Sequence, residues 1–198
     1  LMFRKSSSVQ HEKSSGTDGK QEALFLFTLV ALCFILFFLF LGARPLWDID
    51  EGTHAATSKD MILTGDWVTP RSNGEVFFDK PPLFNWLVAL SFLILGFTEF
   101  AARLPAAFLG LGCVLFTYFL GRQMFNPLTG LLGGLVLATG GEFIGLSIAV
   151  VHDMLLTFCI TATLYFFYRG FIDQTRRKTV ILLSYTFAGF GVLAKGPI

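Results

Sequence analysis

Charged side chains are scarce in this sequence. Asp, Glu, Lys and Arg make up 15% of the 198 residues, and the formal net charge is +1. A chain without a basic excess lacks the electrostatic footprint of a nucleic-acid-binding protein. By contrast, 54% of the residues are hydrophobic and the chain holds 24 Phe. This composition departs from that of soluble domains and favours a membrane protein.

Cysteine is also rare, and Cys33, Cys113 and Cys159 each lie inside an apolar run. We interpret them as small hydrophobic residues rather than as a disulfide framework or a metal site. The sequence offers no Ser–His or Cys–His pairing at a sensible position, which disfavours a covalent nucleophile. It also lacks a Gly-rich phosphate loop, so a lipid-linked donor fits better than a soluble nucleotide.

Long apolar runs dominate the rest of the chain. Residues 1–22 are polar and rich in Ser and Lys, and we expect a disordered cytoplasmic tail. The run from Ala23 to Ala43 is free of charge and long enough to cross a hydrocarbon core of about 30 Å. Because it lacks a small-residue cleavage site, we expect it to stay as an anchor. The predicted fold is all-α, a polytopic transmembrane helix bundle with interfacial helices in an outer loop.

The later apolar windows allow two topologies. If residues 82–97 cross the membrane, Arg122 and the basic cluster at 169–178 fall opposite the basic N-terminal tail. If 82–97 lie along the interface instead, the tail, Arg122 and the cluster share one face, as the positive-inside rule prefers. Pro81 and Pro82 also suit a surface helix. We favour the second topology, with the N-terminus cytoplasmic and crossings near 23–43, 104–121, 128–150, 154–169 and 180–196.

The favoured topology gathers acids and bases from separate segments at one outer surface. These residues are Asp48, Asp50, Glu51, Asp79, Lys80, Arg103, His152, Asp153 and Lys195. The rival topology would move Arg103 and the later groups to the other side. Because a reaction site needs its groups together, we expect an active site at this surface, for a substrate with a lipid tail and a polar head.

The outer loop has internal order. Residues 52–64 have moderate helical propensity and an apolar side, so we expect a short amphipathic helix on the membrane surface. Gly65-Asp66 should end it. Trp47, Trp67 and Trp86 fall in or beside the loop, where indole rings suit the headgroup layer. We therefore expect the loop to be seated in the interface.

Five motifs, in order, resemble the N-terminal half of membrane-embedded GT-C glycosyltransferases. The nearest groups are the bacterial aminoarabinose transferases acting on lipid A and the protein O-mannosyltransferases. The motifs are Leu46–Ala56, Gly65–Pro70, Phe78–Pro82, Ala102–Ala106 and Ala194–Pro197. The resemblance runs from about residue 44 to 198. It implies an N-terminal fragment in which residues 23–198 belong to the transmembrane catalytic module, with an outer catalytic loop at about 44–103.

The resemblance implies sugar transfer from a polyprenyl phosphate carrier to a lipid A-like or protein acceptor, outside a bacterial inner membrane. Asp50 matches the catalytic acid, which would deprotonate or orient the acceptor in one inverting displacement, and Glu51 is its partner. Lys80 would hold the donor phosphate, and Arg103 is a second phosphate candidate. The chemistry agrees, because a cation beside the phosphate stabilises the leaving group and one carboxylate suffices as base.

The resemblance also implies further binding residues. Asp153 matches another acidic position of the family, and Lys195 matches the lysine of the closing motif. Relatives of the lipid A type carry Glu where this chain has Asp79, and in some of them that Glu helps to bind a metal. Asp79 is thus a candidate ligand for a divalent metal, the only cofactor implied. The implied partners are the sugar donor, the acceptor and membrane lipids, with no nucleic acid.

Each of these residues has a structural alternative. Asp50 and Glu51 could cap the following helix, and Lys80 could anchor the interface. Arg103 and Lys195 could extend to lipid headgroups, while Asp153 could simply end a span.

Another class of protein also fits the charged rim: a membrane transporter or lipid-binding module. A transporter would carry its polar groups at mid-membrane near broken helices. Here only Glu142, beside Gly140-Gly141, is deep in a predicted span. The distribution therefore favours an interfacial enzyme.

Overall fold

The computed structural model describes residues 5–46, 50–72, 74–76, 78 and 80–196, with the backbone alone for 5–18. The helices are α1 (Lys5–Cys33), followed by a π-helical segment η1 (Phe34–Phe38), α2 (Glu51–Thr64), α3 (Leu83–Leu95), α4 (Glu99–Met124), α5 (Pro127–Thr139), α6 (Gly141–Ser147), α7 (His152–Ile172) and α8 (Arg177–Lys195). The two-residue strands β1 (Arg71–Ser72) and β2 (Glu75–Val76) pair antiparallel. The predicted all-α helix bundle is confirmed.

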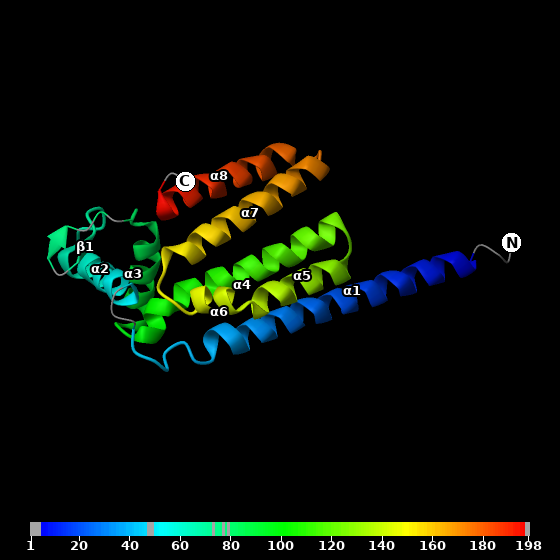
Figure 1. Ribbon diagram of the computed structural model, residues 1–198. Helices are drawn as coiled ribbons and strands as arrows, with labels where there is room; N and C mark the ends of the chain where they lie inside the picture. The colour runs from blue at the N-terminus through cyan, green and yellow to red at the C-terminus, as the bar shows by residue number, and fades with distance from the viewer. Residues whose placement is uncertain (1–4, 47–49, 73, 77, 79, 197–198) are drawn as a thin grey trace.

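The long helices run between two distinct ends of the bundle (Figure 1). At one end lie α2, the hairpin and α3, together with the end of η1, the starts of α4 and α7, and the end of α8. We call this the loop end. The opposite end carries the α4–α5 connection near Arg122 and the α7–α8 connection at 173–176, and we call it the turn end. Segments far apart in the sequence therefore meet at the loop end, as the favoured topology requires.

Three of the described helices are long and apolar enough to cross a membrane: Gly19–Phe38, α4 and α7. The pair α5 and α6, bent by 71°, would make a fourth. Helix α3 has 13 residues and a length of about 20 Å, too short for a core of about 30 Å. It lies across the loop end (Figure 1). The interfacial position of 82–97 stays a prediction. The chain is an integral membrane protein.

Two predicted spans differ from the structure. Helix α8, expected to cross at 180–196, is not among the described helices with the apolar composition of a span; Arg177, Lys178 and Lys195 lie at its ends. The first span ends at Phe38 instead of Ala43. It ends early because the carbonyls of the following residues turn towards Arg103, as described below.

Helix α1 begins at Lys5, inside the segment predicted to be a disordered tail. Extension of an existing helix needs no new nucleus. The polar segment can therefore continue the helix of the first span despite its Ser-rich and Gly-containing sequence.

Close approach of α4, α5 and α1 depends on glycine. A Cβ on Gly130 would lie 2.4 Å from the carbonyl oxygen of Tyr118, and a Cβ on Gly134 would lie 3.0 Å from Leu29. These two glycines allow the helices to pack closely. Around Gly141 and Gly145, by contrast, no described heavy atom lies within 4 Å of such a Cβ.

We predict that Gly130→Ala lowers the free energy of unfolding by about 1–3 kcal/mol, because the obstructing atom belongs to the backbone of α4 and cannot rotate away. The matched control Gly145→Ala should leave stability unchanged or raise it by up to about 1 kcal/mol, since alanine is the better helix former. Thermal unfolding in detergent, followed by circular dichroism, measures both. Equal melting temperatures for the two variants would contradict the packing argument.

Candidate functional site

A buried ion pair lies at the loop end, between Arg103 on α4 and Glu51 at the start of α2. Nε of Arg103 donates to Oε1 of Glu51 (3.0 Å), and Nη2 donates to Oε2 (2.8 Å). Arg103 is 0% and Glu51 is 5% exposed. Two parallel bonds between a guanidinium and a carboxylate fix both the distance and the orientation of the two groups.

The remaining donors of Arg103 reach the chain that leaves the first span. Nη1 donates to the carbonyls of Leu41 (2.9 Å) and Arg44 (2.8 Å), and Nη2 donates to that of Pro45 (2.9 Å). All five N–H groups of a guanidinium are thereby used. In this structure no donor of Arg103 is left for a phosphate, so its contacts support a structural role. The phosphate role stays a prediction.

Glu51 also bonds the segment before α7. The backbone N–H of Val150 donates to Oε1 of Glu51 (3.0 Å). We use the name Arg103 cluster for Arg103, Glu51 and their backbone partners at residues 41, 44, 45 and 150. The cluster ties together the end of the first span, α2, α4 and the start of α7. Sequence reasoning missed this pairing, although a buried arginine in an apolar helix signals a need for a carboxylate partner.

Asp50 lies directly before Glu51 and is exposed. It occupies the N-cap position of α2 but makes no side-chain capping bond. Its carbonyl accepts the backbone N–H of His54 (3.1 Å). The capping alternative is therefore not realised by the Asp50 side chain, whose carboxylate remains on the surface beside an immobilised neighbour.

Aromatic contacts bring α2, α3 and α7 together beneath this surface. The rings of His54 and His152 lie 4.4 Å apart, and Phe84 lies 5.0 Å from His152, measured between ring centroids. Lys80 is half-buried in the segment that leads into α3. Lys80 and Asp50 thus belong to segments packed at the same end of the bundle (Figure 1).

Two further candidate residues, Asp153 and Lys195, form an ion pair. The ammonium group of Lys195, in the last turn of α8, donates to Oδ1 of Asp153 in the first turn of α7. Their side chains are 35% and 45% exposed. The pair joins α7 to α8 at the loop end. The structure thus brings together two residues that are 42 positions apart in the sequence.

The segment after α2 is ordered by Asp66 and by an indole. Gly65 ends the helix, as predicted, with φ of 73°. Oδ1 of Asp66 accepts the backbone N–H groups of Thr69 (3.0 Å) and Val68 (3.1 Å), which hold the pKa of Asp66 below its usual value. Nε1 of Trp86 donates to the carbonyl of Trp67 (2.7 Å). The loop is therefore fastened to α3.

The remaining predicted residues are placed as follows. Trp47, Asp48 and Asp79 lie outside the described residues. Within the described part, no group of three or more His, Cys, Asp or Glu side chains is suited to a metal ion. The metal at Asp79 therefore stays a prediction. Glu142 is exposed in the first turn of α6, directly after the bend.

The arrangement suits acid–base chemistry at a membrane surface. An exposed carboxylate beside an anchored one can accept a proton from an incoming nucleophile. Cations at the same end can stabilise a phosphate that leaves. Both functions need groups held in place, and the Arg103 cluster holds the start of α2, which Asp50 directly precedes.

We predict that Arg103→Met lowers the free energy of unfolding by about 3–5 kcal/mol, because it leaves the Glu51 carboxylate buried without its guanidinium. Lys195→Met, which removes the cation of the exposed pair, should cost at most about 1 kcal/mol. Urea or thermal unfolding in detergent compares the two. Similar losses would show that Arg103 does not carry the stability assigned to it. If Arg103→Met fails to accumulate, Arg103→Lys should give a smaller loss in the same direction.

Comparison with known proteins finds relatives that match most of this chain. A protein of Aeromonas salmonicida, described as an undecaprenyl phosphate-alpha-4-amino-4-deoxy-L-arabinose arabinosyl transferase, is 34% identical over 171 residues, covering 84% of this chain and 31% of the relative. An uncharacterised protein of Aquifex aeolicus is 34% identical over 175 residues, covering 87% of this chain and 34% of its own length. The chain spans about a third of the length of the relatives it matches.

Two solved structures are similar to this chain. The crystal structure of ArnT from Cupriavidus metallidurans bound to undecaprenyl phosphate superposes with a TM-score of 0.81 at 28% identity, over 86% of this chain and 32% of that one. Its apo form gives 0.82 at 27% identity, over 88% and 33%. The sequence pattern of the family described as dolichyl-phosphate-mannose-protein mannosyltransferase matches residues 79–198. The chain belongs to this family, which the resemblance in its motifs had indicated.

Proposed function

We propose that a protein of the relatives' length, with this chain as its N-terminal part, transfers a sugar from a polyprenyl phosphate to a lipid A-like or protein acceptor outside a bacterial inner membrane. The relatives carry the names of undecaprenyl-phosphate-sugar transferases, and one solved relative holds undecaprenyl phosphate. The observation that carries the proposal is an exposed Asp50 next to a buried, fully bonded Glu51, at the end of the bundle that also holds Lys80.

The proposed step is one inverting displacement. A hydroxyl of the acceptor attacks the anomeric carbon, its proton passes to the carboxylate of Asp50, and the bond from that carbon to the phosphate oxygen breaks. The electron pair of this bond leaves with the polyprenyl phosphate. Lys80 stabilises the charge that develops on the phosphate. Asp50 acts as general base within hydrogen-bond reach of the acceptor.

Glu51 and Arg103 are positioning residues in this proposal. Their bonds fix the first turn of α2, and Asp50 directly precedes that turn. A fixed backbone limits the directions that the Asp50 side chain can take. Such preorganisation lowers the entropic part of the activation barrier.

The rival proposal of a transporter draws support from one observation. The bend between α5 and α6 places Glu142 beside a broken helix, which is a feature of transport sites. The other candidates belong to segments at the loop end (Figure 1). This distribution favours surface chemistry.

Asp50→Asn should reduce sugar transfer by about 10²–10⁴-fold, because the amide cannot accept the acceptor's proton. The assay follows labelled sugar from polyprenyl phosphate to membrane lipid or protein, using the full-length parent in membranes. Glu75→Gln is the matched control: it makes the same change at an exposed carboxylate on β2 and should leave transfer intact. Undiminished transfer by a well-expressed Asp50→Asn variant would remove Asp50 from this role.

Topology has a separate test. Single cysteines at Gln123 and Gln174 should react only with reagents on the cytoplasmic side, whereas one at Ser72 should react from outside. The native cysteines are buried and give little background labelling: Cys33, Cys113 and Cys159. Labelling of Gln123→Cys from outside would show that the chain has the opposite orientation. The candidate site would then lie on the cytoplasmic side, away from an external acceptor.

A further inference from the structure

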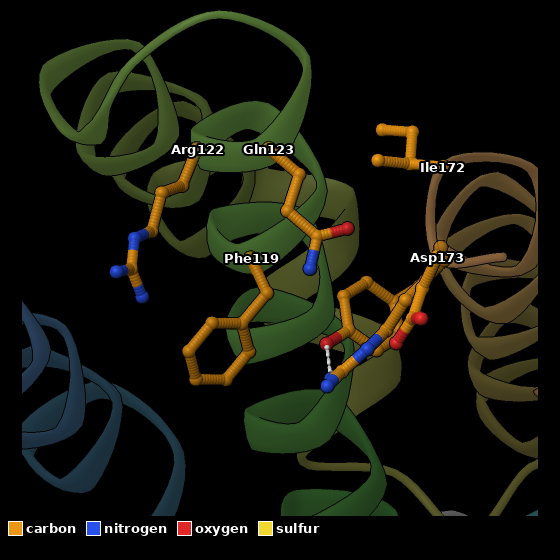
Figure 2. A pocket seen from close by; sticks show the side chains of 7 residues that line it. Phe119, Arg122, Gln123, Ile172 and Asp173 are labelled. Atoms are coloured by element: carbon orange, nitrogen blue, oxygen red, sulfur yellow. Dashed lines mark hydrogen bonds between the residues drawn. The ribbon is translucent and has the colours of Figure 1, made fainter. Parts of the chain in front are cut away.

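A pocket lies at the turn end, away from the candidate catalytic residues. It has a volume of about 720 Å³ and opens between the last turns of α4 and α7. Figure 2 shows Gln123 pointing into it above Phe119, with Asp173 on the opposite wall. Its lining combines aromatic rings with two arginines, Arg122 and Arg169.

The position of the pocket along the bundle fixes its depth. Both α4, which ends at Met124, and α7, which ends at Ile172, are candidate spans. The lining residues at 119–123 and 165–173 thus belong to the last turns of two spans. At that level the hydrocarbon core gives way to lipid headgroups. Exposed rings of Phe125 and Phe171, each 69% exposed, lie at the same level.

Arg169 has unused hydrogen-bonding capacity. Its Nη1 donates to the hydroxyl oxygen of Tyr165 (2.9 Å). Among the described residues this is its one hydrogen bond, and no carboxylate lies within 4.0 Å of it. A guanidinium has five N–H donors, so four remain. The Tyr165 hydroxyl holds the guanidinium in place at the pocket.

The other charged groups that line the pocket are already engaged. Arg122 pairs with Glu22 on α1 (2.8 Å), and Figure 2 shows its side chain directed away from Asp173. Oδ1 of Asp173 accepts the backbone N–H groups of Thr175 (3.0 Å) and Arg176 (3.2 Å) at the start of the α7–α8 connection. Among the residues that line the pocket, Arg169 therefore carries the charge most available to a ligand.

We infer that this pocket binds the phosphate group of an anionic membrane lipid in the leaflet opposite the candidate active site. Arg169 donates to the phosphate, Gln123 supplies an amide donor, and Phe119 and Ile172 contact the apolar part of the lipid. Guanidinium groups bind phosphate oxygens with paired hydrogen bonds. Basic pockets between transmembrane helices at the cytoplasmic surface are typical sites for anionic headgroups.

A lipid fits better here than a further apolar helix. A helix packed over the pocket would bury a guanidinium that has no carboxylate partner, which is costly. A phosphodiester brings the missing negative charge itself. It also carries acyl chains that suit the exposed Phe125 and Phe171 beside the pocket.

The test uses the purified chain in a neutral detergent, titrated with phosphatidylglycerol or phosphatidylcholine of the same acyl composition. Native mass spectrometry measures the first bound lipid. We expect phosphatidylglycerol to bind about tenfold more tightly, with Arg169→Gln removing about tenfold, equivalent to about 1.4 kcal/mol. Arg177→Gln is the matched control. It removes the same charge from the same end but lines no part of the pocket, and it should change binding by less than about twofold.

Other outcomes overturn the inference. Equal binding of the two lipids would exclude a headgroup site. Equal losses in Arg169→Gln and Arg177→Gln would indicate diffuse attraction to the basic turn end. Displacement of the lipid by inorganic phosphate at equal concentration would identify a soluble anion as the ligand. Circular dichroism confirms that each variant is folded, and Arg169→Lys, which keeps the charge but loses the paired geometry, should retain part of the binding.

Discussion

The buried pair of Arg103 and Glu51 is the contact on which the loop end of this protein depends. A guanidinium inside an apolar bundle is costly unless every donor is used, and here each N–H has a partner. The partners of Arg103 lie at residues 41–51, far before it in the sequence, and Glu51 in turn accepts the backbone N–H of Val150, far after it. The bonds that satisfy this buried charge also hold four segments in a fixed arrangement, including the backbone next to Asp50.

The two ends of the bundle carry different sets of charged side chains. Carboxylates and amines that could act on a substrate lie at the loop end, where short elements can hold them without crossing the membrane (Figure 1). The turn end carries mainly arginine and lysine, in and beside short connections between helices. Glycines allow the connecting helices to approach closely. A rigid bundle between the ends keeps each set of groups at its own surface.

Much of this architecture was predictable from the sequence. Apolar run length identified the spans at α1, α4 and α7, and Pro81 and Pro82 marked the start of the short helix α3. The roles of Glu51 and Arg103 were less accessible, because Arg103 also bonds three backbone carbonyls and Glu51 also bonds a backbone N–H, and backbone partners leave no residue signature. The end of the first span was misplaced for the same reason. The lower apolar content of α8 was hidden by a charge-free window within it.

The candidate site was predicted in outline. Motifs near Asp50 and Lys80 located the loop, and the Asp153–Lys195 contact follows from two helices that return to one end. That the neighbours Asp50 and Glu51 have opposite environments could not be read from their identities. A helix turns by about 100° per residue, so consecutive carboxylates face different surroundings, and only the fold decides which one is buried.

The bend between α5 and α6 limits what can surround this bundle. Helix α5 rises about 20 Å from the turn end, less than the core thickness of about 30 Å, so the 71° change of direction falls within the membrane. The helical hydrogen-bond ladder is interrupted there, and Glu142 adds a carboxylate at the same level. Hydrocarbon tails cannot solvate either feature. That flank of the protein must therefore adjoin water or other polypeptide, and only the remaining flanks are free to face lipid chains.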